Sequence, residues 1–204
     1  MRHTFKIAAY SLAAAVLLSS AAQAQTTQVP AAVKAGAYKL DPDHSKVTWS
    51  VTHLGFSTYV GQFAGATGTL KIDPANLAAT ELMVTIDANQ VGTLSEALDK
   101  HLKSPDFLDT AKFPSATFKA TRVARTGDRT ADITGDLTLH GVTKPVVLNA
   151  TFNQAGVNFV DKAYSLGFDA KGVIKRSEFG ITGYVPAISD EVTLHVAAEF
   201  KAAP

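Results

Sequence analysis

The stretch YSLGFDAKGVIKR, residues 164–176, alternates between two kinds of side chain almost without interruption. Leu166, Phe168 and Ile174 share one face, which ends at Arg176, while serine, aspartate and lysine mark the other face. A period of two residues predicts a β-strand with one dry side. At about 3.3 Å per residue the strand would reach roughly 40 Å, longer than most strands. A long apolar wall with a guanidinium at its end suits a long apolar molecule that has a polar head.

Seven further segments show the same alternation, and turn signals such as Thr126-Gly127-Asp128 separate them. They are residues 47–53, 63–72, 82–87, 116–121, 133–140, 146–152 and 192–200, of which 63–72 contains glycines that predict a bend. Short links favour antiparallel neighbours, and about eight such strands close most easily as a barrel or stack as a sandwich. No repeat interrupts the chain, so we expect one domain.

One segment breaks the strand pattern. Thr93 and Glu96 have the spacing of a capping box, which satisfies the free amides at the start of a helix. Apolar residues then recur at helical spacing from Leu94 to Leu102, and Pro105 stops the run. We therefore expect a single short amphipathic helix that lies on the sheet or across a barrel opening.

The first residues predict a signal peptide. Arg2 and Lys6 precede a short alanine- and leucine-rich run, and Ala22-Gln23-Ala24 fits the small-x-small cleavage pattern. An apolar run of this length is too short to span a bilayer, which needs about 20 residues. We assign residues 1–24 to the signal peptide, 25–37 to a flexible leader and 38–201 to the domain. We expect a periplasmic protein with no transmembrane segment after cleavage.

Composition limits the partners of the mature chain. Without Arg2 and Lys6, 17 basic residues face 18 acidic ones, a net charge of −1, which argues against nucleic acid. The chain contains no cysteine, so it has neither disulfides nor a thiol nucleophile, and stability must come from packing. The sequence leaves open whether two barrels pair as a homodimer.

Several spaced motifs resemble the YceI-like family. They are VTHLG at 51–55, VGQF at 60–63, DKHLKSPDF at 99–107, GDLTLHGVTKPV at 135–146 and RSEFGI at 176–181, and the resemblance extends over roughly residues 38–200. It implies an all-β, lipocalin-like antiparallel eight-stranded barrel with one short helix near its mouth. It also implies a long interior channel for polyisoprenoid, isoprenoid quinone or fatty acyl or amide chains. Leu98 stands where the family often has arginine, and Leu108 where a second phenylalanine is common.

The expected site has two parts. The apolar channel is assigned to Trp49, Val51, Phe63, Val84, Ile86, Leu98, Phe118, Phe168 and Ile174, and the polar head of the lipid to Arg176, His53, Asp99 and His101. Small side chains at Ala170 and Gly172 would leave room in the channel. Arg176 has a second interpretation, as the partner of a carboxylate such as Asp99, and the sequence leaves both open.

The remaining residues give little support for catalysis or metal binding. No G-x-S-x-G elbow and no H-E-x-x-H pair is present, so we expect no catalytic residue, no metal and no cofactor besides a bound lipid. The function we predict is therefore lipid binding, as a periplasmic carrier or store. Two alternatives remain: a small enzyme acting on a lipid head group in the same cavity, and a ligand-free structural β-domain.

Overall fold

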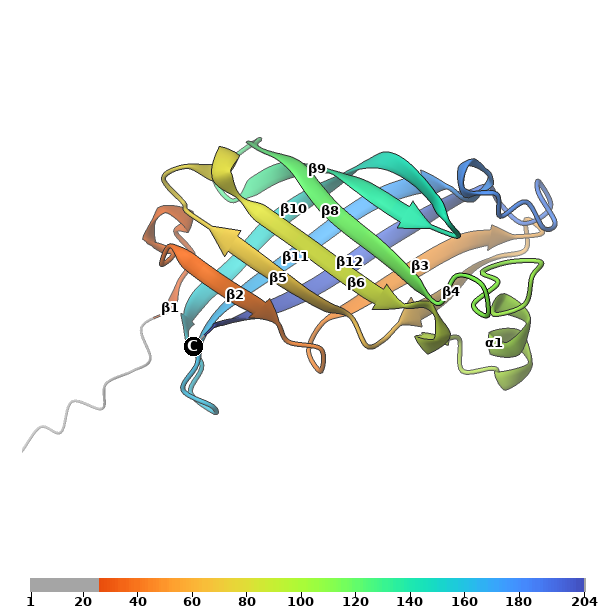
Figure 1. Ribbon diagram of the computed structural model, residues 1–204, viewed down its shortest axis with the longest axis horizontal. Helices are drawn as coiled ribbons and strands as arrows, with labels where there is room; N and C mark the ends of the chain where they lie inside the picture. The colour runs from red at the N-terminus through yellow and green to blue at the C-terminus, as the bar shows by residue number, and fades with distance from the viewer. Residues whose placement is uncertain (1–25, 204) are drawn as a thin grey trace, which may run out of the picture.

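The expected antiparallel barrel is present in the structure, a computed structural model that describes residues 26–203 (Figure 1). The predicted signal peptide lies outside the described residues. Around the barrel the eight strands are β2 (Gly36–Leu40), β5 (Thr67–Ile72), β6 (Glu81–Asp87), β8 (Ser115–Arg125), β9 (Thr130–Leu139), β10 (Val142–Val157), β11 (Tyr164–Lys175) and β12 (Glu191–Ala202). The sheet closes where Phe200 of β12 pairs with Leu40 of β2.

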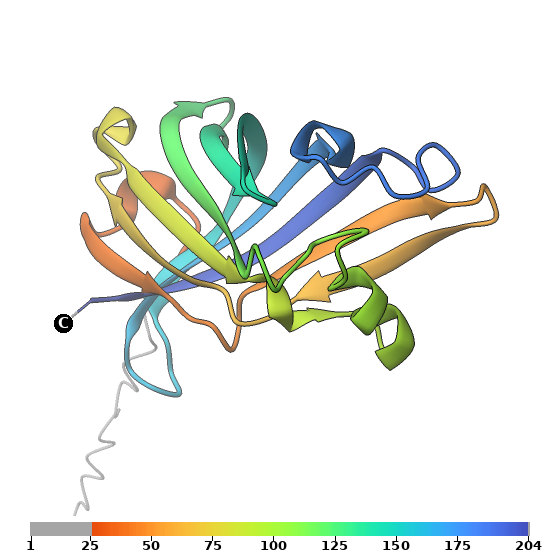
Figure 2. The same ribbon diagram turned by 45° about the vertical axis from the view of Figure 1, so that its right-hand side comes forward.

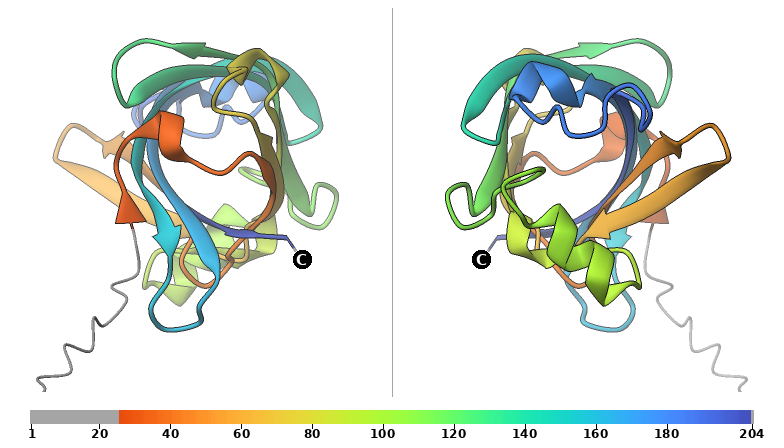
Figure 3. Two further views of the ribbon diagram at one scale, coloured as in Figure 1. Left: turned by 90° about the vertical axis from the view of Figure 1, so that its left-hand side faces the viewer. Right: turned by 90° about the vertical axis from the view of Figure 1, so that its right-hand side faces the viewer.

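A hairpin extends the sheet beyond the closed barrel. The first half of β12 pairs with β3 (Lys46–His53), which pairs with β4 (Ser57–Phe63), and β4 ends against the short β7 (Val91–Gly92). In Figures 2 and 3 this hairpin leans away from the barrel wall. The buried Ser45 helps to fix the step between β2 and β3, because its hydroxyl group accepts a hydrogen bond from the amide of Glu199 at 3.0 Å. Residues 63–72 therefore form parts of two strands, separated by a bend at Gly65, whose φ is +69°.

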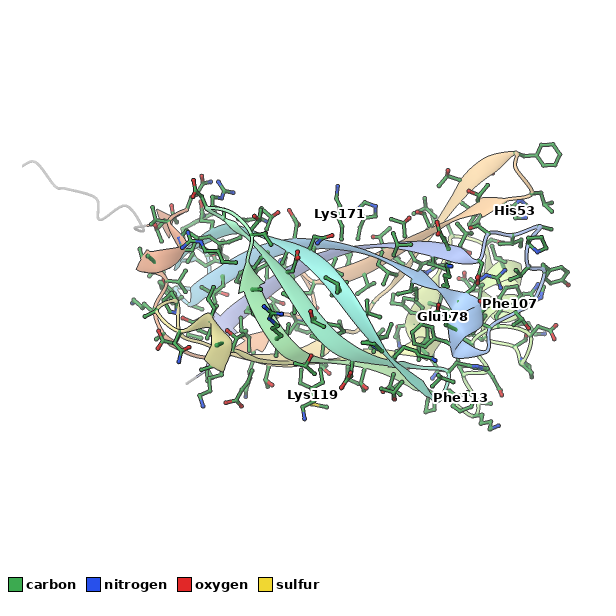
Figure 4. All side chains as sticks on the ribbon, turned by 90° about the horizontal axis from the view of Figure 1, so that it is seen from above. His53, Phe107, Phe113, Lys119, Lys171 and Glu178 are labelled. Atoms are coloured by element: carbon green, nitrogen blue, oxygen red, sulfur yellow. The ribbon has the colours of Figure 1, made fainter. Side chains whose placement is uncertain are left out.

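The long strand β11 has the dry face that its sequence predicts. Leu166, Gly172 and Ile174 are buried, whereas Asp169, Lys171 and Val173 on the other face are exposed. Lys171 stands on the outer surface in Figure 4. The strand ends at Lys175, and Arg176 begins the 3-10 helix η4 (Arg176–Phe179).

The buried side chains form two clusters along the barrel. One includes Tyr38, Leu70, Phe152, Leu166 and Phe200, and lies toward the end where β2 begins. The other consists of Phe118, Val146, Ile174 and Phe179, and lies toward η4. Burial of these side chains provides most of the stability, as expected for a chain without disulfides.

The described part of the expected flexible leader is packed against the barrel instead. Strand β1 (Thr26–Thr27) pairs with β10, and the 3-10 helix η1 (Pro30–Ala32) follows it. Val33 is only 6% exposed within the first cluster, and the amide of Lys34 donates to the Tyr164 hydroxyl group at 3.2 Å. The proline- and alanine-rich composition of this segment does not predict its ordered structure, because the order comes from contacts with β10 and β11.

Within the described residues the single α-helix, α1 (Glu96–Leu102), lies at the end of the barrel opposite η1 (Figure 3, right). Its cap differs from the predicted capping box, because Ser95 and not Thr93 accepts the hydrogen bond from the amide of Leu98. The Thr93 hydroxyl group donates to the carboxylate of Asp99 instead, at 2.5 Å. Leu94 has a φ of +64° and is fully exposed, so it lies outside the helix. Within residues 26–203, the helices are too short or too polar to cross a membrane.

Candidate functional site

The barrel contains an apolar cavity of about 250 Å³. All eight barrel strands contribute to its wall, because each turns one set of alternating side chains inward. The wall consists mainly of aliphatic and phenyl groups: Leu40, Leu70, Ile72, Leu82, Val84, Ile86, Phe118, Ile133, Leu137, Val146, Leu148, Ala150, Phe152, Phe168, Ala170, Leu194, Val196, Ala198 and Phe200. Such a wall favours hydrocarbon and disfavours any unpaired polar group.

Four of the predicted channel residues line this cavity, namely Val84, Ile86, Phe118 and Phe168. The others lie elsewhere: Trp49 and Val51 are on β3, Phe63 is on β4, Leu98 is on α1, and Ile174 belongs to the cluster beside η4. The period-two pattern identifies an inward face on each strand. It does not reveal that β3 and β4 leave the closed barrel.

Three small side chains lie next to one another in the cavity wall. Ala150 of β10 pairs in register with Ala131 of β9 on one side and with Ala170 of β11 on the other, and all three line the cavity. Gly172 makes a different contribution. A Cβ there would lie 2.7 Å from the Leu148 side chain, so this glycine allows close packing of Leu148 and leaves no empty space.

The cavity extends to the end of the barrel where η1 lies, because Pro30 and Ala31 of η1 line it. Figure 3 (left) views the barrel from this end. Its rim includes Pro30 and Ala31 from η1 and Leu77 from the 3-10 helix η2 (Leu77–Ala79). The β8–β9 turn adds Arg125 and Arg129 to the rim, together with Asp128. Arg125 and Arg129 are not among the predicted site residues, because their segment has the sequence of a turn. The available signal was two guanidinium groups at the ends of strands whose inner faces are apolar.

Arg176 lies at the other end of the barrel and does not line the cavity. It is 5% exposed, and its guanidinium donates to four backbone carbonyl groups, those of Ile181, Gly183, Ile188 and Ser189, at 2.8 to 3.1 Å. None of the salt bridges within residues 26–203 includes it. Burial lowers the pKa of Arg176, and the charge of Asp190 opposes that shift. In this structure the guanidinium therefore holds the loop of residues 181–189 in place.

The other predicted head-group residues lie at the same end as Arg176, each with its own neighbours. His53 pairs with Ile188 and packs beside Tyr59. Asp99 accepts from Thr93, and His101 packs edge-on against Phe107 at 5.0 Å. Figure 4 shows His53 and Phe107 at this end. Because the cavity wall includes none of the four residues, their head-group role stays a prediction.

A second polar cluster lies on the barrel wall, where β2 ends. Asp41 is 5% exposed and accepts from His44 Nδ1 and from Lys201 Nζ, both at 2.8 Å. Burial alone would raise the pKa of Asp41, but hydrogen bonds from Lys201, His44 and the amide of Asp43 outweigh it and lower the pKa well below its usual range. The hydrogen bond with Asp41 in turn raises the pKa of His44. With Glu199 this cluster resembles a cation site, and the ammonium group of Lys201 supplies the cation.

The chain matches the family model of the YceI-like domain over residues 38–200. It is 40% identical over 169 residues to a UPF0312 protein of Pseudomonas fluorescens, covering 82% of this chain and 87% of that protein. It is 42% identical over 170 residues to Protein YceI of Salmonella arizonae, covering 81% and 86%.

Solved structures agree with the fold. BcnA of Burkholderia cenocepacia superposes with a TM-score of 0.71 at 25% identity, covering 78% of this chain and 98% of that one. A polyisoprenoid binding domain from Saccharophagus degradans superposes with a TM-score of 0.60, covering 83% and 100%; at 16% identity this likeness shows the fold alone. By the family model and the two sequence relatives, the chain belongs to the YceI-like family.

Proposed function

We propose that this protein binds one long apolar lipid inside the barrel and acts as a periplasmic carrier or store for it. The lipid would be a polyisoprenoid, an isoprenoid quinone or a fatty acyl or amide chain. The observation that carries the proposal is the hydrocarbon wall of the cavity, which continues across all eight strands. The Saccharophagus domain of the same fold, which is named for polyisoprenoid binding, supports it.

The wall also explains how such binding would be strong. Each methylene group transferred from water to an apolar wall contributes about 0.8 kcal/mol, so a long chain needs few polar contacts. The alanines at 131, 150 and 170 keep the cavity wide enough for a chain to lie against β9, β10 and β11. The wall also includes polar residues, among them Lys46 where β3 begins and Arg125 and Arg129 beside the β8–β9 turn, but hydrocarbon makes up most of it, which supports binding better than chemistry at a lipid head.

The dependence of affinity on chain length tests the proposal. Protein stripped of co-purified lipid would be loaded with the neutral fluorophore N-phenyl-1-naphthylamine, which straight-chain alcohols of ten to twenty carbons would then displace. We expect the affinity to rise about fourfold for each added methylene until the cavity is full. Displacement that does not depend on chain length, or no binding of the fluorophore, would contradict the proposal.

A further inference from the structure

The turn between β3 and β4 carries apolar side chains into water. Phe56 is 88% exposed and Leu54 is also exposed. A Cβ added to Gly55, which lies between them, would have no atom within 4 Å. The end of the turn is therefore not packed against the described part of the chain, and both side chains are free to contact a partner.

Leucine is an unusual residue in this turn. The amide of Phe56 donates to the carbonyl group of His53, and the two residues between them, Leu54 and Gly55, have φ values of +53° and +74°. A turn of this kind normally takes glycine, asparagine or aspartate, because a larger side chain is strained at positive φ. Leu54 therefore adds strain and places hydrocarbon in water, so the stability of the fold does not account for it.

A second apolar turn lies beside the first. The amide of Leu54 donates to the carbonyl group of Ala187 at 2.9 Å, which joins the β3–β4 turn to the loop of residues 181–189. Figure 2 shows the hairpin and this loop at the same end of the molecule. Tyr184 and Val185 of the loop are exposed. Together the two turns form what we call the apolar tip, which consists of Leu54, Phe56, Tyr184 and Val185.

Both segments that form the apolar tip are free of charged side chains. Residues 47–70 and 179–189 contain no Asp, Glu, Lys or Arg, although these types make up 18% of the chain. Charges begin at the flank, where Tyr184 packs edge-on against His101, whose Nε2 lies 4.0 Å from a carboxylate oxygen of Asp106. The apolar tip is therefore an uncharged projection with a polar flank.

This combination fits the surface of a phospholipid bilayer better than the surface of another protein. Apolar side chains gain free energy when they enter the bilayer interface, tyrosine is enriched there, and charged side chains are costly at greater depth. A stable protein interface takes about 20 to 30 residues from each partner and has a polar rim, whereas the tip consists of two short turns. We propose that the apolar tip inserts shallowly into a phospholipid bilayer and holds the protein at the membrane surface.

The proposal goes beyond lipid binding in the barrel and does not depend on it. The tip lies at the end of the barrel opposite η1, the same end as α1 (Figures 1 and 2). A docked protein would therefore keep the η1 end of its cavity in the aqueous phase.

Co-sedimentation with phospholipid vesicles tests the proposal. Protein purified without detergent would be mixed with vesicles of phosphatidylcholine, with and without phosphatidylglycerol. Phe56→Ser should lower the partition coefficient about tenfold or more, because transfer of a phenyl group out of water favours binding. Neither added salt nor phosphatidylglycerol should change the partition coefficient, because the tip carries no charge.

Phe159→Ser is the matched control. Phe159 is 77% exposed in the β10–β11 turn, but Asp161 and Lys162 follow it there, so its loss should leave vesicle binding unchanged. Neither variant should change the free energy of unfolding, because both phenyl groups are exposed. Leu54→Asn should weaken vesicle binding severalfold while the midpoint of urea unfolding stays the same or rises, because asparagine adopts positive φ more easily than leucine.

A site-specific probe shows which part of the protein enters the bilayer. The chain contains no cysteine, so a single introduced cysteine can be labelled with the environment-sensitive fluorophore NBD. Addition of vesicles should shift the emission of the label on Phe56→Cys to shorter wavelength and leave that of the label on Phe159→Cys unchanged.

Three results would overturn the proposal. The first is a parent protein that does not bind vesicles; a dimer that Phe56→Ser dissociates would then show that a second copy covers the tip. The second is an equal loss of vesicle binding in Phe56→Ser and Phe159→Ser. The third is binding that high salt abolishes, which would assign it to charged residues elsewhere. Displacement of N-phenyl-1-naphthylamine separates this proposal from the proposed function, because failed displacement contradicts only lipid binding in the barrel, and intact displacement without vesicle binding overturns only the docking.

Discussion

Filling the cavity beside Ala150 should weaken lipid binding strongly and leave the barrel folded. Ala150 is 7% exposed and is flanked in register by Ala131 and Ala170, so the ring of Ala150→Phe would project into the cavity and not into large neighbours. If the ring displaces about four methylene groups of a bound chain, at about 0.8 kcal/mol each, binding weakens by about 3 kcal/mol, or roughly a hundredfold or more.

The assay is displacement of N-phenyl-1-naphthylamine by geranylgeraniol, combined with urea unfolding of the stripped proteins. Val147→Phe is the matched control, because Val147 lies on the outer face of the same strand and is 46% exposed. A phenyl group that fills empty space adds buried apolar area, so the free energy of unfolding of Ala150→Phe should stay at or above that of the parent protein. A loss of about 1 to 3 kcal/mol, typical of overpacking, with binding retained, would refute the reasoning, because it would mean that side chains already fill the interior.

Three other predictions concern the framework. Arg176→Met should lower the free energy of unfolding by about 3 kcal/mol or more, because it leaves four carbonyl groups without their donor. Lipid affinity, measured by displacement, should stay unchanged. A loss of stability below about 1 kcal/mol would contradict the role of Arg176 in holding the loop. Gly61→Ala should lower the free energy of unfolding by about 1 to 3 kcal/mol and change the fluorescence of Trp49, the single tryptophan, because the new Cβ would lie 2.2 Å from its ring. Gly92→Ala is the control, since a Cβ at Gly92 would have no atom within 4 Å, and it should change neither the stability nor the fluorescence. The pKa of Asp41 is lowered in the folded state, so the contribution of its carboxylate to stability is complete above about pH 5 and is lost as the pH falls. The difference in free energy of unfolding between the parent protein and Asp41→Asn, measured with urea, should therefore shrink between about pH 5 and pH 2. A difference that does not change with pH would refute this linkage.

Period-two alternation was enough to predict the long strands, because each has one face in the barrel and one in water. β11 begins at the predicted residue and ends one residue early, where Arg176 turns into η4. The strands that the pattern missed are short or depend on partners. β2 is only five residues long, and its pairing with β5 and β12 identifies it as a strand. β4 is exposed at four of its seven residues, so it lacks a clear apolar face.

The site was harder to predict than the fold. Inward faces identify Val84, Ile86, Phe118 and Phe168, but alternation carries no information on which end of a barrel is open. That depends on where η1 packs, and its contacts with β10 and β11 are far away in sequence. For the same reason the buried cation was assigned to the head group: the four carbonyl groups that surround Arg176 belong to a loop whose path the sequence does not define.

Mass spectrometry of the purified protein tests the central claim most directly. The full chain, produced with its own N-terminal segment and purified without detergent, would be weighed under native conditions and then under denaturing conditions. The hydrocarbon wall of the cavity predicts a native mass that exceeds the chain mass by one long-chain lipid, which denaturation releases and fragmentation identifies. A native mass equal to that of the bare chain, for protein that also fails to take up added prenyl or acyl chains, would contradict the claim.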